Sequence, residues 1–469
     1  MQFNIFIKEI NIEGEGERER GREGEEERKM EFSGLGHLFV TVFLYNYASC
    51  IVIPAITDVT MAALCPGQDE CSLAIYLTGF QQAITGLGGL IMTPVIGNLS
   101  DTYGRKAMLT LPFTLAIMPI VVLAYGRTRY FFYAYYIIKT LTAMVGEGSV
   151  LCLSLAYMAD NIPEGRRASA FGILGGVSSA AFVCGTLTAR FLSTTSTFKV
   201  SAFVAVIAAV YMQTLLADSS CRIGETSPLI TKNGKAEVAP SDGDSRPKMP
   251  IGKKVPSLDD TVQLLRSSLT FTQAAVVAFF SNLGEGGLRA SLLYFLKAQF
   301  HFEKNQFANL MLIIGITGTI SQLLLMPLLS PFMREESLLR IGLFAGCVHI
   351  FLYSLAWSSW VPYFAGLFSV LAIFAPPCMR SIASKQVGPD EQGKAQGCIS
   401  GICAFADIVS PLIFTPLTAL FLSEKAPFHF PGFSIMCIGF ALMIAYIQSV
   451  LIRTAPPISK IGNRTSAEA

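Results

Sequence analysis

The sequence predicts an all-α polytopic membrane protein, with twelve transmembrane helices arranged as two pseudo-symmetric six-helix bundles. Of its 469 residues, 52% are hydrophobic and only 14% are charged, whereas a soluble domain has about 25% charged residues. The mean hydropathy is +0.51, and apolar stretches of about 20 residues, the length that crosses a bilayer as a helix, recur along the chain. Because the stretches are continuous rather than alternating, and backbone polar groups in lipid must be satisfied internally, helices are expected rather than a barrel.

The chain begins with a charged extension, residues 1–30. Glu and Arg alternate with Gly from Glu13 to Lys29. Such a low-complexity tract cannot bury a core, so the extension is expected to be disordered. Met30 directly precedes the first apolar stretch, which raises the hypothesis that Met30 rather than Met1 is the natural start.

Twelve apolar segments follow in two groups of six, which predicts an N-terminal bundle over 31–217 and a C-terminal bundle over 269–455. The intervening residues 218–268 are rich in Ser, Gly, Pro, Lys and Asp and are interpreted as a linker, and 456–469 form a short tail. The expected spans are 34–56, 73–96, 107–125, 130–158, 168–192, 198–217, 270–297, 305–328, 338–356, 360–383, 395–422 and 431–452.

The distribution of Lys and Arg predicts the orientation. An even number of spans puts both termini and the linker on one side, and the loops on that side hold most of the basic residues. The positive-inside rule therefore places the termini, the linker and the tail in the cytosol. The membrane itself stays open between the plasma membrane and vacuolar or endosomal membranes. Besides those in the linker, the basic residues assigned to this side are Arg105, Lys106, Arg166, Arg167, Arg334, Arg340, Arg380, Lys385 and Lys394.

Most of the eleven cysteines lie in apolar segments, where a thiol behaves as a small hydrophobic group. Cys65 and Cys71 differ, because they flank a polar loop after the first span. They could form a disulfide if that loop faces an oxidising compartment; two free thiols are the alternative. The sequence shows no metal-ligand spacing, catalytic constellation or basic stripe, so we expect no metal, no cofactor, no enzymatic activity and no nucleic-acid partner.

The most specific motif is the polar turn Gly97–Lys106, which follows the second apolar segment. Its glycines permit a tight turn and close helix approach. Asp101 can accept charge-assisted bonds from a helix N-terminus or an arginine, while Arg105 and Lys106 can face anionic lipid or an acid. A merely solvated basic loop is the alternative reading.

This turn matches the pattern G-x-L-[AS]-D-x-x-G-R-[KR] and resembles the loop between helices 2 and 3 of the major facilitator superfamily of solute transporters. Residues 31–455 look most like the branch of tetracycline/proton antiporters and hippocampus-abundant-transcript-like proteins. The resemblance implies a loop that latches the two halves on the cytosolic side, a role carried to Gly97, Asp101, Gly104, Arg105 and Lys106. The segment after Cys184 lacks the proline of drug antiporters, and Tyr45 stands where tetracycline exporters have Asp, so drug export is not implied.

Ionisable residues inside predicted spans are expensive in lipid and are candidates for solute or proton binding. Lys139 and Glu147 are eight residues apart, on about one face of a helix. Glu285 and Arg289 have the spacing of an i,i+4 ion pair, and Glu285 lies in a glycine-rich stretch read as a helix break, a mark of transporter binding sites. Asp407 is the fifth candidate. For each, a buried structural pair or an interfacial side chain is the alternative.

Together these features predict a monomeric transporter that moves a small organic solute by alternating access, with the two bundles rocking around a midplane site and the proton gradient as the driver. Glu285 and Glu147 are the expected protonation or solute site and Lys139 the counter-charge. The alternative is a non-transporting receptor or scaffold with the same fold. The solute and the choice among symport, antiport and uniport stay open.

Overall fold

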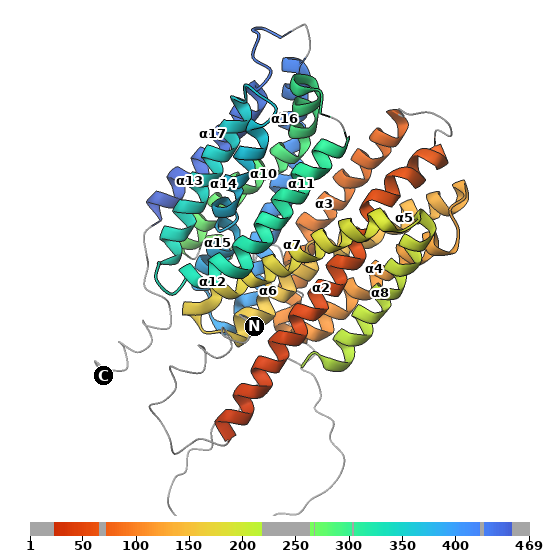
Figure 1. Ribbon diagram of the computed structural model, residues 1–469. Helices are drawn as coiled ribbons and strands as arrows, with labels where there is room; N and C mark the ends of the chain where they lie inside the picture. The colour runs from red at the N-terminus through yellow and green to blue at the C-terminus, as the bar shows by residue number, and fades with distance from the viewer. Residues whose placement is uncertain are drawn as a thin grey trace, which may run out of the picture.

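The computed structural model describes residues 23–64, 72–217, 263–266, 268–302, 304–422 and 426–452, and every regular element in those ranges is helical (Figure 1). Most of the predicted N-terminal extension, most of the linker and the predicted tail lie outside the described residues. Cys65 and Cys71 also lie outside them, so their disulfide stays a prediction.

The N-terminal bundle contains six membrane passes, shown from red to yellow-green in Figure 1. The fourth pass is divided into two helices, and a short 3₁₀ turn, η1 (Glu164–Arg166), precedes the fifth. The helices are α2 (Glu23–Leu64), α3 (Ser72–Tyr103), α4 (Arg105–Tyr125), α5 (Arg129–Gly146) with α6 (Ser149–Asn161), α7 (Arg167–Phe191) and α8 (Thr194–Leu215).

The C-terminal bundle repeats this plan, shown from green to blue. Its second pass contains a π-helical turn, η2 (Ser321–Leu325), its fourth pass is again divided, and a 3₁₀ turn, η3 (Pro389–Glu391), again precedes the fifth. The helices are α10 (Leu269–Phe300), α11 (Lys304–Ile320) with α12 (Met326–Leu329), α13 (Glu335–Ser354), α14 (Val361–Ala372) with α15 (Ala375–Ser384), α16 (Gln392–Leu422) and α17 (Phe433–Leu451).

All twelve expected spans correspond to passes of this fold, and within the described residues eleven are long and apolar enough to cross a membrane. The twelfth is α10, whose polar residues, including Asn282, Glu285 and Arg289, lower its mean hydropathy. The first helix is longer than expected, because α2 begins at Glu23 instead of residue 34. The chain is therefore an all-α, multi-pass membrane protein built from two six-helix bundles.

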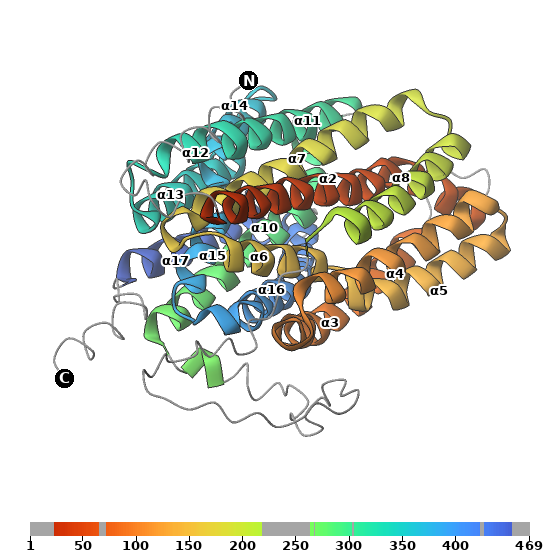
Figure 2. The ribbon, with the colours of Figure 1, turned by 90° about the horizontal axis from the view of Figure 1, so that it is seen from below.

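Each bundle has its own apolar core: in the described part of the chain, buried apolar side chains form one cluster in the C-terminal bundle and two in the N-terminal bundle. The bundles meet along two seams, α3 against α16 and α7 against α11 and η2 (Figures 1 and 2). Glycines occupy both seams, as expected where helix backbones approach closely. A methyl group on Gly175 would lie 2.7 Å from the amide of Gln322, and one on Gly86 would lie 2.8 Å from Ile408.

The α3–α16 seam is tightest at Gly97 and Gly393, where a methyl group on either glycine would overlap the carbonyl oxygen of the other. We call this end of the molecule the base. Because α3 ends at the base and successive passes are antiparallel, α2 and α10 begin there and α8 and α17 end there. The two bundles therefore join closely on the side that also carries both ends of the helical domain.

Replacing Gly97 by Ala should lower the melting temperature of the purified protein in detergent by several degrees. The added methyl group would press on the Gly393 carbonyl and on the Gly397 Cα, 2.9 Å away, and overpacking of this kind costs about 1–3 kcal/mol. The matched control is Gly165→Ala, also at the base, where nothing lies within 4 Å of the added group. Equal melting temperatures for the two variants would show that the seam is not tightly closed.

Candidate functional site

A cavity of about 580 Å³ lies between the two bundles. It is lined by residues of α3, α6, α10, α15 and α16 and of the connection between α5 and α6. Four ionisable residues face it: Glu147, Arg289, Arg380 and Asp407. A second cavity of about 360 Å³ lies within the N-terminal bundle. The two cavities share Glu147, Gly148 and Leu151 in their walls, so the fourth pass separates them.

Glu147 owes its position to a break in the fourth pass. The helix α5 ends at Gly146 and α6 begins at Ser149, with Gly148 in the left-handed region at φ 84°. Glycine reaches this conformation without the steric penalty of other residues. The break turns the exposed carboxylate of Glu147 toward both cavities.

Lys139 lines the smaller cavity together with Glu147, as their eight-residue spacing predicts. Its side chain is half-buried. Tyr45 and Asn46 from α2 and Ser178 from α7 line the same cavity. The N-terminal bundle therefore presents a cation and an anion within one polar cavity.

Arg289 and Asp407 form an ion pair between α10 and α16, with Nη2 and Oδ1 2.6 Å apart. The two side chains retain 64% and 44% exposure, which fits their position on the cavity wall. The expected pair between Glu285 and Arg289 is wrong for this structure. The i,i+4 spacing allowed that pair, but the neighbouring helix supplies a better-placed carboxylate.

The predicted helix break at Glu285 is also wrong, because α10 is continuous from Leu269 to Phe300. Its glycines serve close packing instead: a methyl group on Gly286 would overlap the Ser410 hydroxyl, and one on Gly287 would lie 2.5 Å from the Phe414 ring. Glu285 itself is exposed. It stands one helical turn from Asn282 and Arg289, which both line the central cavity, and so it flanks the cavity rather than lining it.

Arg380 is the cavity residue that sequence reasoning missed, because it was counted among the basic residues of the cytosolic side. The structure places it within α15, with 8% exposure, on the wall of the central cavity. Its Nη1 donates to Gln396 Oε1 at 3.3 Å and to Ser400 Oγ at 3.0 Å, both on α16. The available signal was its position inside the expected span 360–383.

At the base, the carboxylate of Asp101 accepts hydrogen bonds from the backbone N–H groups of Gly393 at 2.9 Å and Lys394 at 2.8 Å. These N–H groups belong to the first turn of α16, where helical donors have no intrahelical partner and the dipole favours an anion. Asp101 of the N-terminal bundle therefore caps a helix of the C-terminal bundle. This contact joins the two halves directly.

Arg105 holds this arrangement in place from within the N-terminal bundle. It is buried, forms an ion pair with Asp101, and donates from Nε to Asp160 Oδ2 at 2.8 Å and from Nη1 to Ser100 Oγ at 2.6 Å. Gly104 precedes it with φ at 91°, a conformation that favours glycine. Lys106 follows on α4 and is half-buried.

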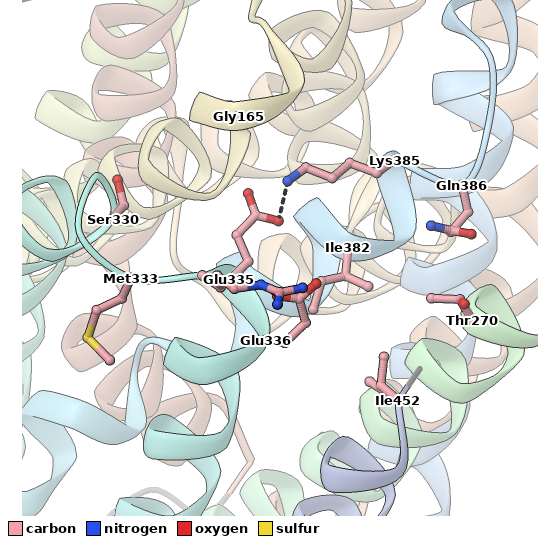
Figure 3. A pocket seen from close by; sticks show the side chains of 11 residues that line it. Gly165, Thr270, Ser330, Met333, Glu335, Glu336, Ile382, Lys385, Gln386 and Ile452 are labelled. Carbon is pink, nitrogen blue, oxygen red and sulfur yellow. Dashed lines mark ion pairs between the residues drawn. The ribbon is translucent and has the colours of Figure 1, made fainter. Parts of the chain in front are cut away.

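The C-terminal bundle contains a copy of the Arg105–Asp160 pair with its charges exchanged. Glu335 begins α13 as Arg105 begins α4. Lys385 directly follows α15, and Asp160 lies in the last turn of α6, the corresponding helix of the other bundle. The Lys385 Nζ lies 2.9 Å from Glu335 Oε2 (Figure 3). Glu335 also accepts a hydrogen bond from Ser381 at 2.9 Å. The C-terminal bundle thus keeps an ion pair at this position, whereas residues 330–334, which precede α13, contain no acid that could correspond to Asp101.

Arg167 makes a second contact between the bundles at the base. Its Nη1 donates to the backbone and side-chain oxygens of Ser384 at 3.2 and 3.0 Å, and its Nη2 donates to the Ala159 carbonyl at 2.9 Å. Ser384 ends α15, where a cation complements the helix dipole. Asp101 and Arg167 therefore hold the two ends of the α15–α16 connection with opposite charges.

Exchanging the two charges of the Glu335–Lys385 pair should restore the stability that either single substitution removes. Glu335→Lys places a second cation beside Lys385, whose side chain is 25% exposed while that of Glu335 is 10% exposed. Breaking a buried pair costs about 3–5 kcal/mol, so we expect a large loss of melting temperature and of monodisperse protein on size-exclusion chromatography. Adding Lys385→Glu should recover most of both.

The corresponding exchange in the N-terminal bundle, Arg105→Asp with Asp160→Arg, should not recover. Asp101 would then face a second carboxylate instead of the guanidinium that it pairs with now. Recovery of the melting temperature to the same extent as in the exchange of Glu335 and Lys385 would contradict the role of Arg105 as a common partner of Asp101 and Asp160.

Known proteins resemble this chain in sequence and in fold. The family model described as Major Facilitator Superfamily matches residues 38–411. The chain is 23% identical over 359 residues to human Hippocampus abundant transcript-like protein 1, covering 75% of this chain and 66% of that protein. It is 24% identical over 382 residues to the class H Tetracycline resistance protein of Pasteurella multocida, covering 80% and 87% of the two chains. The match to the hippocampus-abundant-transcript relatives thus spans slightly less than two thirds of their length.

Solved structures share the fold. The human organic anion transporter MFSD10 (TETRAN) superposes with a TM-score of 0.70 at 15% identity, over 89% of this chain and 99% of that one. The E. coli Fucose:proton symporter FucP superposes with a TM-score of 0.64 at 12% identity, over 90% and 98% of the two chains.

Proposed function

Because the chain belongs to the major facilitator superfamily, we propose that it is a secondary active transporter of a small organic solute, working by alternating access and coupled to protons. The observation that carries the proposal is the charged cavity of about 580 Å³ at the junction of two bundles, which specific polar contacts join at the base. A protein named as a Fucose:proton symporter resembles the chain in fold, and a protein named as a Tetracycline resistance protein resembles it in sequence. Both likenesses support transport.

In this proposal the base faces the cytosol, as the basic residues of the base loops and of the linker favour. The structure is then the state closed toward the cytosol. Opening toward the cytosol requires Asp101 to leave the first turn of α16 and Arg167 to leave the end of α15. The loop Gly97–Lys106 acts as the latch of this gate, with Gly97 and Gly104 permitting the approach and Arg105 holding Asp101.

Replacing Asp101 by Asn should weaken the latch and slow transport at least tenfold in proteoliposomes. An amide oxygen can accept one of the two backbone hydrogen bonds, but it removes the charge that pairs with Arg105 and complements the helix dipole. The matched control is Asp390→Asn, an acid at the base in η3 outside this contact. Wild-type rates in Asp101→Asn, with the control also unchanged, would remove the latch from the mechanism.

Proton coupling requires a carboxylate that is accessible from the cavity. Glu285 flanks the central cavity, Glu147 stands between both cavities, and Asp407 is held by Arg289. Glu285 has no ion pair within the described residues, whereas Asp407 has one, so we retain Glu285 and Glu147 as the proton or solute carboxylates and Lys139 as the counter-charge. Protonation of such a group would change the charge of the cavity between the two states of the transporter.

Replacing Glu285 by Gln should leave folding intact but abolish solute-driven acidification or alkalinisation of liposomes that contain a pH-sensitive dye. The amide keeps the size of the carboxyl group but carries no exchangeable charge. Glu164→Gln, a half-buried glutamate in η1 at the base, is the matched control and should behave as wild type. If the solute flux of Glu285→Gln kept its pH dependence, Glu285 would not be the coupling residue. Glu147 would then be the remaining candidate, or coupling would involve neither carboxylate. Absence of saturable flux from well-folded wild type across a broad solute panel would favour the receptor or scaffold instead.

A further inference from the structure

We infer that Arg380 binds the carboxylate of the transported solute, so that the solute is an organic anion. This inference rests on the proposed transport function and adds to it the chemical class of the solute. Arg380 was not among the candidates that the sequence suggested. It reaches the cavity from α15 near the base, within two helical turns of the closed seam at Gly393.

The surroundings of Arg380 fix its orientation without neutralising its charge. Its guanidinium donates to the amide oxygen of Gln396 and to the hydroxyl of Ser400, and Gln396 Nε2 in turn donates to the Arg380 carbonyl at 3.4 Å. Both acceptors are neutral. Among the residues that the structure describes, no carboxylate lies within ion-pair distance of this guanidinium.

A buried arginine without a carboxylate partner is unusual, because the guanidinium stays charged in proteins. Charged groups inside membrane segments are costly and normally pair or mark a transport pathway. The structure gives Arg105 two carboxylate partners and Arg289 one, yet it gives Arg380, 8% exposed, only neutral acceptors. A counter-ion that arrives with the solute would compensate the Arg380 charge.

The other charges of the cavity leave this role to Arg380. Arg289 and Asp407 neutralise one another across the cavity wall. Glu147 stands on the α5–α6 break, on the side shared with the second cavity, where Lys139 also lies. Arg380 thus remains as the unpaired cation of the larger cavity within the described residues, and a solute carboxylate could approach it while Ser400 and Gln396 keep the guanidinium in place.

The cavity volume and the chemistry of arginine define the solute further. A volume of about 580 Å³ lies within the usual range for small-molecule sites, about 300–1,000 Å³. A guanidinium fork matches a carboxylate with two parallel hydrogen bonds. Apolar side chains such as Leu151, Ala404 and Ile408 line part of the wall, and polar side chains such as Thr85 and Asn282 line another part. This wall can accommodate an anion that carries a hydrocarbon or aromatic body.

The test is a flux screen in proteoliposomes with matched solutes: benzoate, phenylacetate and octanoate, each beside its primary amide and its amine analogue. We expect saturable flux of carboxylates at least tenfold above that of the amides and amines. Arg380→Gln should reduce carboxylate flux at least tenfold, whereas Arg380→Lys, which keeps the charge but loses the fork, should keep a fraction of it with a raised KM. Arg190→Gln, an exposed arginine on α7, is the matched control and should behave as wild type.

A second variant separates anion binding from a structural role of Arg380. Ser400→Asp places a carboxylate where the Ser400 hydroxyl now accepts a hydrogen bond from Arg380 at 3.0 Å. This internal anion should occupy the guanidinium and abolish carboxylate flux while keeping or raising the melting temperature. A merely structural Arg380 would tolerate the change without loss of flux.

Two results would overturn the inference and leave transport intact. In the first, wild type moves amides or amines but not carboxylates. In the second, Arg380→Gln and Ser400→Asp, both well folded by melting temperature, move carboxylates at the wild-type rate. No saturable flux of any solute from well-folded wild type would instead refute the proposed transport function, and this inference with it.

Discussion

The architecture depends on the capping of one helix by the acid of another bundle. Asp101 supplies the anion that the first turn of α16 requires, and the glycine pair at Gly97 and Gly393 brings the two backbones close enough for that bond to form. Neither feature is sufficient by itself. A larger residue at the crossing would hold the carboxylate away from the N–H groups, and an uncapped helix start would leave buried donors unsatisfied. The seam closes only when both conditions hold.

The base and the cavity also differ in the partners that their charged side chains have. At the base, Arg105 and Glu335 are buried, each has an opposite charge as partner, and each begins a helix at an equivalent position of its bundle. The exchange of sign between the two bundles shows that the repeat preserves an ion pair rather than a particular residue. In the cavity, charges are exposed, paired across a wall, or held by neutral groups. The fold thus places its buried ion pairs where the bundles close. On the wall of the central cavity it places Glu147 and Arg380, which have no ion pair among the described residues.

The helices could be predicted from sequence because hydropathy and span length are local properties. The shared cavity of Lys139 and Glu147 followed from spacing on one pass. Partner choice between passes could not be predicted in this way, since Arg289 pairs with Asp407 on another helix. Glycines were equally ambiguous: the same residue type breaks the fourth pass at Gly148, where φ is positive, but packs a continuous helix at Gly286. Only the tertiary neighbours decide between these uses.

Arg380 was missed for a related reason: counting charges by topology assigns a residue near a span end to the loop. Arg380 lies buried within the short helix α15, which begins at Ala375 after an interruption of the fourth pass of the C-terminal bundle. The fourth pass of the N-terminal bundle is interrupted as well, and there Glu147 occupies the break. The equivalent passes of both bundles are therefore divided, and each contributes one charge, of opposite sign, to the wall of the central cavity. Since one charge belongs to each bundle, the proposed rocking of the two bundles would change the distance between these charges.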